Sequence, residues 1–292
     1  MKLLYPLAKR FIAGDDVKSM LRNIAYYDLV TINYVGESAT APCIAKANLQ
    51  EYLSLIDNLK GSWAVRQYEI SIKLSQFGQL PSEWKEPVEQ IVNAVKDTPQ
   101  IKIKFDMEKA DLIDDTIKFS RCFNDVGIVL QANMERSYTD LVDIIDRHRR
   151  VRICKGAYEG DIKNMGKIRG AYLELVEEIF KSGYFYHKSH KQELVSLATH
   201  DEYLIKRIQE LSTQYSCKTN FYFEMLFGIR RDLAKRLTAE GYKVRTYVPY
   251  GADWMPYVVR RLMEFKNLRF VIVNTVKEFF AKDKYYYYVR SS

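Results

Sequence analysis

The stretch VGIVLQANMERSYTDLVDIIDRHRRVRICKGA, residues 126–157, contains two apolar runs separated by a segment of helical period. Residues 126–133 and 150–157 have the composition of buried strands, and apolar residues recur every three or four positions across 138–150. A strand, a helix and a second strand in succession predict a parallel pair joined by a crossover helix. This stretch therefore indicates an α/β fold.

The same alternation extends over most of the chain. Six further strand-like runs lie at 29–34, 69–76, 100–107, 194–200, 219–226 and 242–250. Helical periodicity is present at 48–60, 83–96, 114–123, 168–183, 202–215 and 229–241, and a last helix is predicted over 251–265. Eight such units in 292 residues predict a (βα)8 barrel. A doubly wound sheet is the alternative, but no strand is followed by the GxGxxG turn of a Rossmann nucleotide site.

No low-complexity linker or run of charge divides the chain. We expect one barrel domain over residues 1–292, with a short N-terminal helical region at about 1–28 and a C-terminal tail at about 266–292. The N-terminal apolar run is short and is interrupted by Pro6, so neither a signal peptide nor a membrane span is predicted. We therefore expect a cytoplasmic protein.

The net charge and the cysteine content limit which ligands, metals and cellular compartment the sequence predicts. Lys and Arg total 45 against 37 Asp and Glu, and this mildly basic balance fits an anionic ligand or peripheral contact with the inner face of a membrane. No Lys/Arg block is dense enough to predict nucleic-acid binding. The four cysteines form no CxxC pair and no histidine cluster joins them, so we expect no metal site and a reducing compartment.

Polar residues gather where the predicted strands end. They are Lys73, Ser75, Asp106, Glu108, Gln131, Asn133, Arg152, Lys155, Thr199, His200, Asp201, Glu224, Arg245 and Tyr247. Barrel enzymes carry their chemistry at the C-terminal ends of the strands. One buried charge can be a satisfied core group, but seven strands that share the pattern favour a common site.

The individual residues leave alternatives open. Lys73 and Asp106 fit either a structural ion pair across neighbouring strands or a pair that holds an anionic substrate. His200 fits either a strand-end structural role or the site. Arg152 lies inside an apolar strand, where a guanidinium needs an anion or an electron-rich partner, so we favour a function for it.

The last predicted helix carries a distinct pattern. Tyr257, Arg260, Arg261 and Glu264 stand at i, i+3, i+4 and i+7, which is one helix face. A solvated face explains one arginine. Two arginines with a glutamate one turn away suit a carboxylate or phosphate clamp, because the planar guanidinium binds such groups bidentately.

Several segments together resemble the proline dehydrogenase family, the flavin-dependent enzymes of proline catabolism. In family order they are RFIAG (10–14), SIKLS (71–75), FDME (105–108), VLQAN (129–133), VRICKGAY (151–158), ATHD (198–201), FEMLFGIR (223–230) and RTYVPYGADWMPYVVRRLMEF (245–265). The combination of KGAY, ATHD and YVxRRLxE is the most specific part. The resemblance implies a distorted (βα)8 barrel.

The resemblance also implies a reaction and its site. FAD would oxidise L-proline to Δ1-pyrroline-5-carboxylate, and the electrons would pass to a quinone. Lys73, Arg260 and Arg261 would hold the proline carboxylate, with Asp106 beside the lysine. Ala157, Tyr158, Leu226, Tyr247 and Tyr257 would line the pocket. Arg152 would lie beside the reactive flavin nitrogen, and the other FAD contacts would come from Gln131, Lys155, Gly156, Thr199, His200, Arg261 and Glu264.

Two alternative functions remain. One is a related flavoenzyme that oxidises hydroxyproline or another cyclic amino acid, although relatives acting on hydroxyproline tend to have a smaller residue at the position of Tyr247. The other is a non-catalytic barrel that binds an anion or a partner protein. The chain departs from the family pattern at Asn133, usually aromatic, at Glu224, commonly Gln, and at Phe265, commonly Asn. Residues 159–172 also match poorly.

Overall fold

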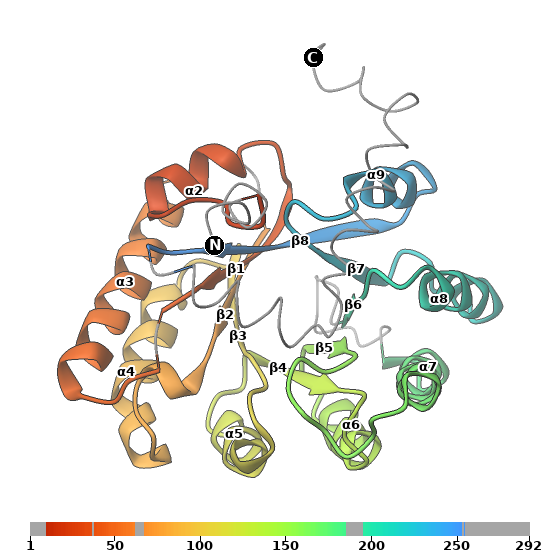
Figure 1. Cartoon of the computed structure of the whole chain (residues 1–292), viewed down its shortest axis with the longest axis horizontal. Helices are drawn as coiled ribbons and strands as arrows, with labels where there is room; N and C mark the ends of the chain where they lie inside the picture. Colours follow the sequence, from red (N-terminus) through yellow and green to blue (C-terminus); the bar gives the residue numbers. More distant parts are fainter. Residues whose placement is uncertain (1–9, 37, 62–66, 185–194, 253, 255–292) are drawn as a thin grey trace.

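Eight parallel strands close into a barrel in the computed structural model, which describes residues 10–36, 38–61, 67–184, 195–252 and 254. Each strand pairs with the next along the chain, and β8 closes the ring on β1 (Figure 1). The strands are β1 Leu29–Tyr34, β2 Gln67–Ile72, β3 Ile101–Phe105, β4 Val126–Gln131, β5 Val151–Cys154, β6 Val195–Ala198, β7 Phe221–Leu226 and β8 Lys243–Tyr250. The predicted (βα)8 barrel is confirmed.

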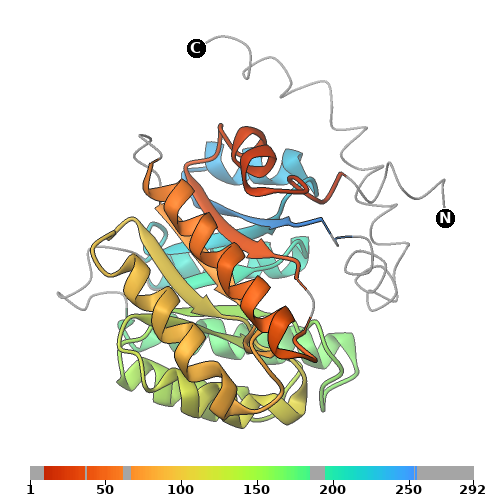
Figure 2. The same cartoon turned by 90° about the vertical axis from the view of Figure 1, so that its left-hand side faces the viewer.

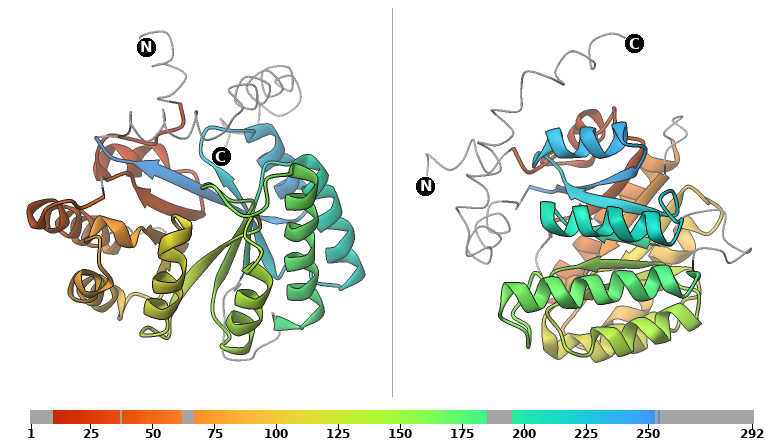
Figure 3. Two further views of the ribbon diagram at one scale, coloured as in Figure 1. Left: turned by 60° about the horizontal axis from the view of Figure 1, so that its bottom comes forward. Right: turned by 90° about the vertical axis from the view of Figure 1, so that its right-hand side faces the viewer.

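Helices cover the outside of this barrel, as the end-on view of Figure 1 shows. They are α2 Val17–Asn23, α3 Pro42–Lys60, α4 Pro81–Val95, α5 Ile113–Ser120, α6 Ser137–Asp146, α7 Met165–Lys181, α8 Glu202–Gln214 and α9 Arg231–Ala239. Two short 3-10 turns, η1 Leu74–Gln76 and η2 Ala110–Leu112, follow β2 and β3. Helix α3 packs beside α4 (Figure 2), and α7 packs beside α8 (Figure 3).

The end of β2 differs from the sequence prediction. The predicted strand 69–76 stops at Ile72, and the chain then turns into η1. The carboxylate of Glu108 accepts hydrogen bonds from the backbone N–H of Ser75, at 3.0 Å, and from its hydroxyl, at 2.6 Å. These bonds hold the chain away from the strand ladder directly after Lys73.

Helix α3 begins six residues earlier than its apolar pattern predicts, at Pro42 instead of residue 48. Proline suits the first helical position, because its missing N–H would have no partner there. Residues 42–47 carry no buried side chain, so this part of the helix leaves no periodic signal in the sequence.

The apolar core lies between the strands and the helices. One cluster packs under α2, α3 and α4 and includes Met20, Tyr52 and Trp84; the other packs under α5 to α9 and includes Val176 and Leu204. The interior of the barrel is polar by contrast. Barrel interiors are usually filled by branched apolar side chains. The charged side chains buried inside this barrel must therefore be stabilised by partners of opposite charge or by hydrogen bonds.

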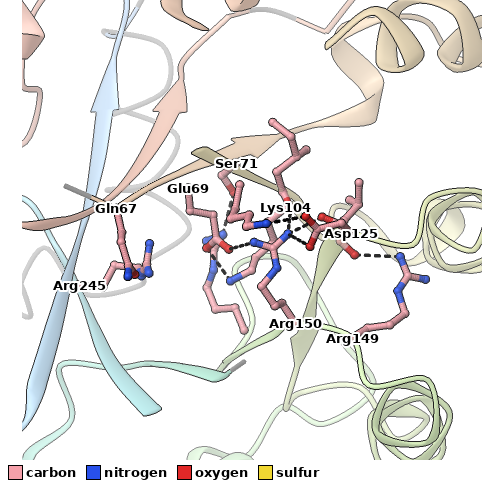
Figure 4. A network of polar contacts seen from close by, with 12 residues as sticks. Gln67, Glu69, Ser71, Lys104, Asp125, Arg149, Arg150 and Arg245 are labelled. Carbon is pink, nitrogen blue, oxygen red and sulfur yellow. Dashed lines mark hydrogen bonds and ion pairs between the residues drawn. The ribbon is translucent and has the colours of Figure 1, made fainter. Parts of the chain in front are cut away.

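Four buried charged side chains form a group inside the barrel, which we call the charged floor: Glu69, Lys104, Arg150 and Arg245. All four are less than 10% exposed. Lys104 Nζ lies 2.6 Å from one Glu69 oxygen and Arg150 Nη1 lies 3.8 Å from the other (Figure 4). The Arg245 guanidinium lies over the ring of Tyr222, 4.3 Å from its centroid. Two cations therefore contact one buried carboxylate, and Arg245 acts on it at longer range.

This excess of positive charge shifts both partners of the Glu69–Lys104 pair. Burial alone would raise the pKa of Glu69, but Lys104, Arg245 and Arg150 outweigh it and bring that pKa to about 2. Burial lowers the pKa of Lys104 to about 8. Glu69 opposes this shift, and the positive charge of the nearby Arg152 adds to it. In the charged floor, the ionised form of Glu69 is therefore stabilised, and the protonated form of Lys104 is destabilised.

Candidate functional site

The carboxylate of Asp106 collects side chains from three strands. Its Oδ1 accepts hydrogen bonds from Ser71 Oγ, at 2.7 Å, and from Arg152 Nη2, at 3.1 Å. Its Oδ2 accepts one from the hydroxyl of Tyr247, at 3.0 Å. Arg152 Nη2 also donates to Ser71 Oγ at 2.7 Å. The structure therefore brings the predicted residues Asp106, Arg152 and Tyr247 into one network.

The alternation of side chains along each strand explains why these residues meet. Successive side chains of a strand point to opposite faces, so Glu69, Ser71 and Lys73 all face the barrel interior from β2. Arg152 lies in the middle of β5 and is in register with residues of β4 and β6. The parallel ladders bring the strand ends to the same side of the barrel, where the network forms.

Lys73 lies near this network and acts electrostatically on Asp106. Its Nζ donates to Asn33 Oδ1 at 3.2 Å. Burial would raise the pKa of Asp106, but the positive charges of Arg152 and then Lys73, together with the bonds from Ser71 and Tyr247, lower it below its ordinary value. Asp106 is therefore ionised at neutral pH, and its carboxylate accepts hydrogen bonds from Ser71, Arg152 and Tyr247.

Arg152 contacts two carboxylates. Its Nε lies 3.5 Å from Glu224 Oε1, and the adjacent Nη2 lies 3.1 Å from Asp106 Oδ1. Its guanidinium lies over the ring of Tyr247, 4.9 Å from the centroid. Burial lowers the pKa of Arg152, but Glu224 and Asp106 together raise it above its ordinary value. Within the described part of the chain Nη1 makes no hydrogen bond, so this nitrogen is left for a ligand.

A second group of charges lies beyond the ends of β5 and β6. Asp201 accepts hydrogen bonds from Arg169, at 2.8 Å and 3.2 Å, and from Lys155, at 3.4 Å. The backbone N–H of Asp201 donates to Thr199 Oγ1 at 3.1 Å. One carboxylate is shared by two cations, and the remaining positive charge suits an anionic ligand such as a diphosphate.

Gln131 and His200, both predicted cofactor contacts, bond to the protein backbone. Gln131 donates to the carbonyl of Glu108 and accepts from the N–H of Ala157, each at 3.1 Å. His200 Nε2 accepts the N–H of Leu226 at 2.9 Å, which requires an unprotonated nitrogen. Burial, with the charges of Arg230 and Lys155, lowers the pKa of His200 to about 3. The imidazole is neutral at pH 7, and both residues shape the strand ends, so their cofactor contacts stay predictions.

Asn133 organises the loop that follows β5. Its Nδ2 donates to the carbonyl of Tyr158 at 2.8 Å. Gly156 adopts a φ of 118°, and a Cβ at this position would collide with the Asn133 side chain. Ala157 and Tyr158 are partly buried on this loop, as is Leu226 at the end of β7. Asn133, a departure from the family pattern, thus bonds directly to one predicted pocket residue, Tyr158.

Two residues of these networks were not singled out from the sequence: Ser71, which bridges Asp106 and Arg152, and Arg169, which lies in the poorly matching segment. Glu224 was counted among the strand-end residues of a common site but was given no individual role. For Ser71 and Glu224 the available signal was the alternation with Lys73 and Leu226 along their strands. Arg169 gave only a weaker one, its place in the second turn of a helix that follows a strand-end loop.

The predicted arginine clamp and its neighbours belong to a part of the chain that the structure does not describe. Tyr257, Arg260, Arg261, Glu264 and Phe265 lie outside the described residues. Among the residues that the structure describes, no three His, Cys, Asp or Glu side chains are grouped as metal ligands would be. None of the described helices is both long and apolar enough to span a bilayer.

A sequence model of the family described as proline dehydrogenase matches residues 18–271. The chain belongs to the proline dehydrogenase family. A curated proline dehydrogenase of Deinococcus radiodurans is 30% identical over 295 residues, which cover 94% of this chain and 91% of that protein. Proline dehydrogenase 1 of Bacillus subtilis strain 168 is 30% identical over 93% of this chain and 91% of its own length.

Solved structures agree with this family in fold. Proline utilization A of Bdellovibrio bacteriovorus, inactivated by N-propargylglycine, superposes with a TM-score of 0.79 at 18% identity, over 92% of this chain and 33% of that one. Proline utilization A of Corynebacterium freiburgense gives a TM-score of 0.74 at 19% identity, over 96% and 32%. The chain thus spans about a third of these larger proteins. Proline dehydrogenases are oxidoreductases, and this member of their family is an enzyme of that class.

Proposed function

We propose that this chain catalyses the FAD-dependent oxidation of L-proline to Δ1-pyrroline-5-carboxylate. The observation that supports this most directly is the buried Arg152, held by Asp106 and Glu224 at the strand ends of a proline dehydrogenase-family barrel, with Nη1 left for a ligand. A buried guanidinium fixed in this way is a preorganised stabiliser of negative charge.

The polar groups of the site fit FAD in two places. Arg152 would lie beside the flavin ring, where its charge stabilises the negative charge of the reduced cofactor. Lys155 and Arg169, which share Asp201, would bind the diphosphate. Bound FAD would supply the hydride acceptor, while the protein supplies placement and electrostatics.

The remaining site residues would hold the substrate. Lys73, Arg260 and Arg261 are proposed to bind the proline carboxylate. The bond from the Tyr247 hydroxyl to Asp106 fixes the orientation of the ring, which would form one wall of the pocket. Ala157, Tyr158 and Leu226 would complete the wall. Rigid placement of the ring carbon against the acceptor is the largest contribution that such side chains make to rate.

The proposal includes a quinone as the acceptor of electrons from the reduced cofactor. A formal charge of +8 supports contact with an anionic membrane surface, where a quinone resides. Steady-state assays that compare a short-chain quinone with oxygen test this part. A rate that is equal with either acceptor would contradict it.

An anaerobic visible spectrum tests the central proposal. The purified protein, saturated with FAD, is expected to show the flavin bands and to lose them when L-proline is added, but not when the acyclic L-alanine is added. Protein that cannot be loaded with FAD would contradict the proposal. A bound flavin that responds to hydroxyproline and not to L-proline would favour the alternative substrate.

Replacing Arg260 or Arg261 with alanine is expected to raise the KM for proline by about tenfold or more, with a smaller change in kcat. Loss of one charge-assisted hydrogen bond to a carboxylate costs about 1.5–3 kcal/mol. Initial rates over a range of proline concentrations measure the change. An unchanged KM in both variants would contradict the assignment of the clamp.

A further inference from the structure

Glu224 is a buried carboxylate with an unusual set of contacts. It lies on β7, and its side chain is 1% exposed. Its one ion-pair partner among the described residues is Arg152, with 3.5 Å between Oε1 and Nε. Neither carboxylate oxygen accepts a hydrogen bond from any residue that the structure describes. Buried carboxylates usually accept several hydrogen bonds, so the ion pair with Arg152 is the main direct contact that Glu224 makes among the described residues.

Asp106, the other carboxylate beside Arg152, is in the opposite situation. Its charge is shared among donors from Ser71, Arg152 and Tyr247. Glu224 makes its one direct ion pair among the described residues with Arg152, and it also acts at longer range on Lys104. Burial lowers the pKa of Arg152, whereas Glu224 and Asp106 both raise it.

The charge of the site therefore depends on Glu224. Among the described residues at the strand ends, and leaving the charged floor aside, Lys73, Asp106, Arg152 and Glu224 carry two positive and two negative charges, which cancel. Without the carboxylate of Glu224 the same group would carry one net positive charge. In a site that excludes water, one unit of charge changes the energy of a neighbouring anion strongly.

We propose that Glu224 is a positioning residue that acts through Arg152 and lowers the reduction potential of the bound flavin. Its carboxylate lies 3.5 Å from Nε of the guanidinium and offsets the positive charge that would otherwise favour the reduced, anionic cofactor. This inference rests on the proposed function in one respect, the location of a flavin beside Arg152.

The test is the midpoint potential of the flavin in the full-length protein, measured by anaerobic equilibration with a redox dye. Glu224→Gln keeps the shape of the side chain and removes its charge. We expect the equilibrium constant for two-electron reduction to rise by about tenfold or more, which corresponds to about 30 mV toward positive potential. A potential equal to or below that of the parent protein would overturn the proposal.

Glu69→Gln is the matched control. Glu69 is as deeply buried as Glu224, but its carboxylate is bound by Lys104 and faces the charged floor. It also affects Arg152 less than Glu224 does. We expect a smaller shift of the potential in this variant, and a shift as large as that of Glu224→Gln would show a general charge effect and overturn the specific role.

A second variant keeps the test decisive if Glu224→Gln does not fold. Glu224→Asp withdraws the carboxylate from Arg152 by one methylene group, so its potential is expected to lie above that of the parent. A potential at or below the parent value would overturn the proposal. Dye equilibration needs bound flavin and no turnover, so a protein that binds FAD but ignores proline would refute the proposed function alone.

Discussion

Replacing Asp106 with asparagine is expected to lower kcat/KM for proline by about 100- to 1,000-fold, which is about 3–4 kcal/mol of transition-state stabilisation. The carboxylate accepts hydrogen bonds from Ser71, Arg152 and Tyr247 at once. The asparagine amide keeps one oxygen that accepts hydrogen bonds and replaces the other with an NH2 group. At least one of the donors to Asp106 would then face this NH2 group and lose its hydrogen bond. Removal of one partner from a buried ion pair typically costs about 3–5 kcal/mol.

Tyr247→Phe provides the graded control for this experiment. It removes a single hydrogen bond to Asp106 and keeps the ring over Arg152, so a loss of about tenfold or less in kcat/KM is expected. Steady-state kinetics on FAD-saturated protein measure both variants. If Asp106→Asn were no more impaired than Tyr247→Phe, Asp106 would not be the centre of the network.

Glu69→Gln is expected to lower the free energy of unfolding by about 3–5 kcal/mol at pH 7, because it leaves Lys104, Arg150 and Arg245 buried without their shared anion. Urea unfolding of the FAD-free protein measures the change. The double variant Glu69→Gln with Lys104→Met removes one of the stranded cations and is expected to be more stable than Glu69→Gln alone. A double variant that is less stable would contradict the account.

The acid limb of stability gives a second measure of the same residue. The pKa of Glu69 is about 2 in the folded protein, below its value in the unfolded chain. A carboxylate of this kind stabilises the fold fully above its unfolded pKa, near 4.3, and loses that contribution as the pH falls toward 2. The parent protein should therefore lose more stability between pH 5 and 2, by roughly 3 kcal/mol, than Glu69→Gln does. Parallel acid titrations of the two proteins measure the difference.

Lys104 acts at the other end of the pH range. Its folded pKa of about 8 lies below the value of about 10.4 in an unfolded chain. Protonation is then less favourable in the folded state, and the cost of the charged lysine is relieved as the pH rises from 8 toward 10.4. The charged floor thus affects the free energy of unfolding at both ends of the pH range. Protonation of Glu69 lowers it in acid, and deprotonation of Lys104 raises it in alkali.

The barrel could be predicted from the sequence because its strands are apolar on their outer faces and separated by helices with a clear period. The bounds of β1 and of the predicted run 29–34 agree fully. The errors have local causes. The side chain of Glu108, distant in sequence, ends β2, and the first turns of α3 bury nothing.

The site was predictable in part for a related reason. Asp106, Arg152 and Tyr247 are conspicuous because charged or hydroxylated side chains interrupt buried runs. Ser71 gave no such signal, since a serine is tolerated in almost any strand. Whether Gln131 bonds a ligand or the backbone depends on the path of the loop around Ala157, which side-chain type alone does not specify.

The charged floor also bears on how this barrel could be engineered. In most barrels the end that carries the chemistry and the end that carries stability can be altered separately. Here Glu69 at the floor and Arg152 at the strand ends influence each other's ionisation. Apolar replacement of a buried ion pair often stabilises a protein. In this barrel the same replacement would change the electric field at Arg152, so a redesign of the floor for thermostability would also have to preserve the ionisation of that guanidinium.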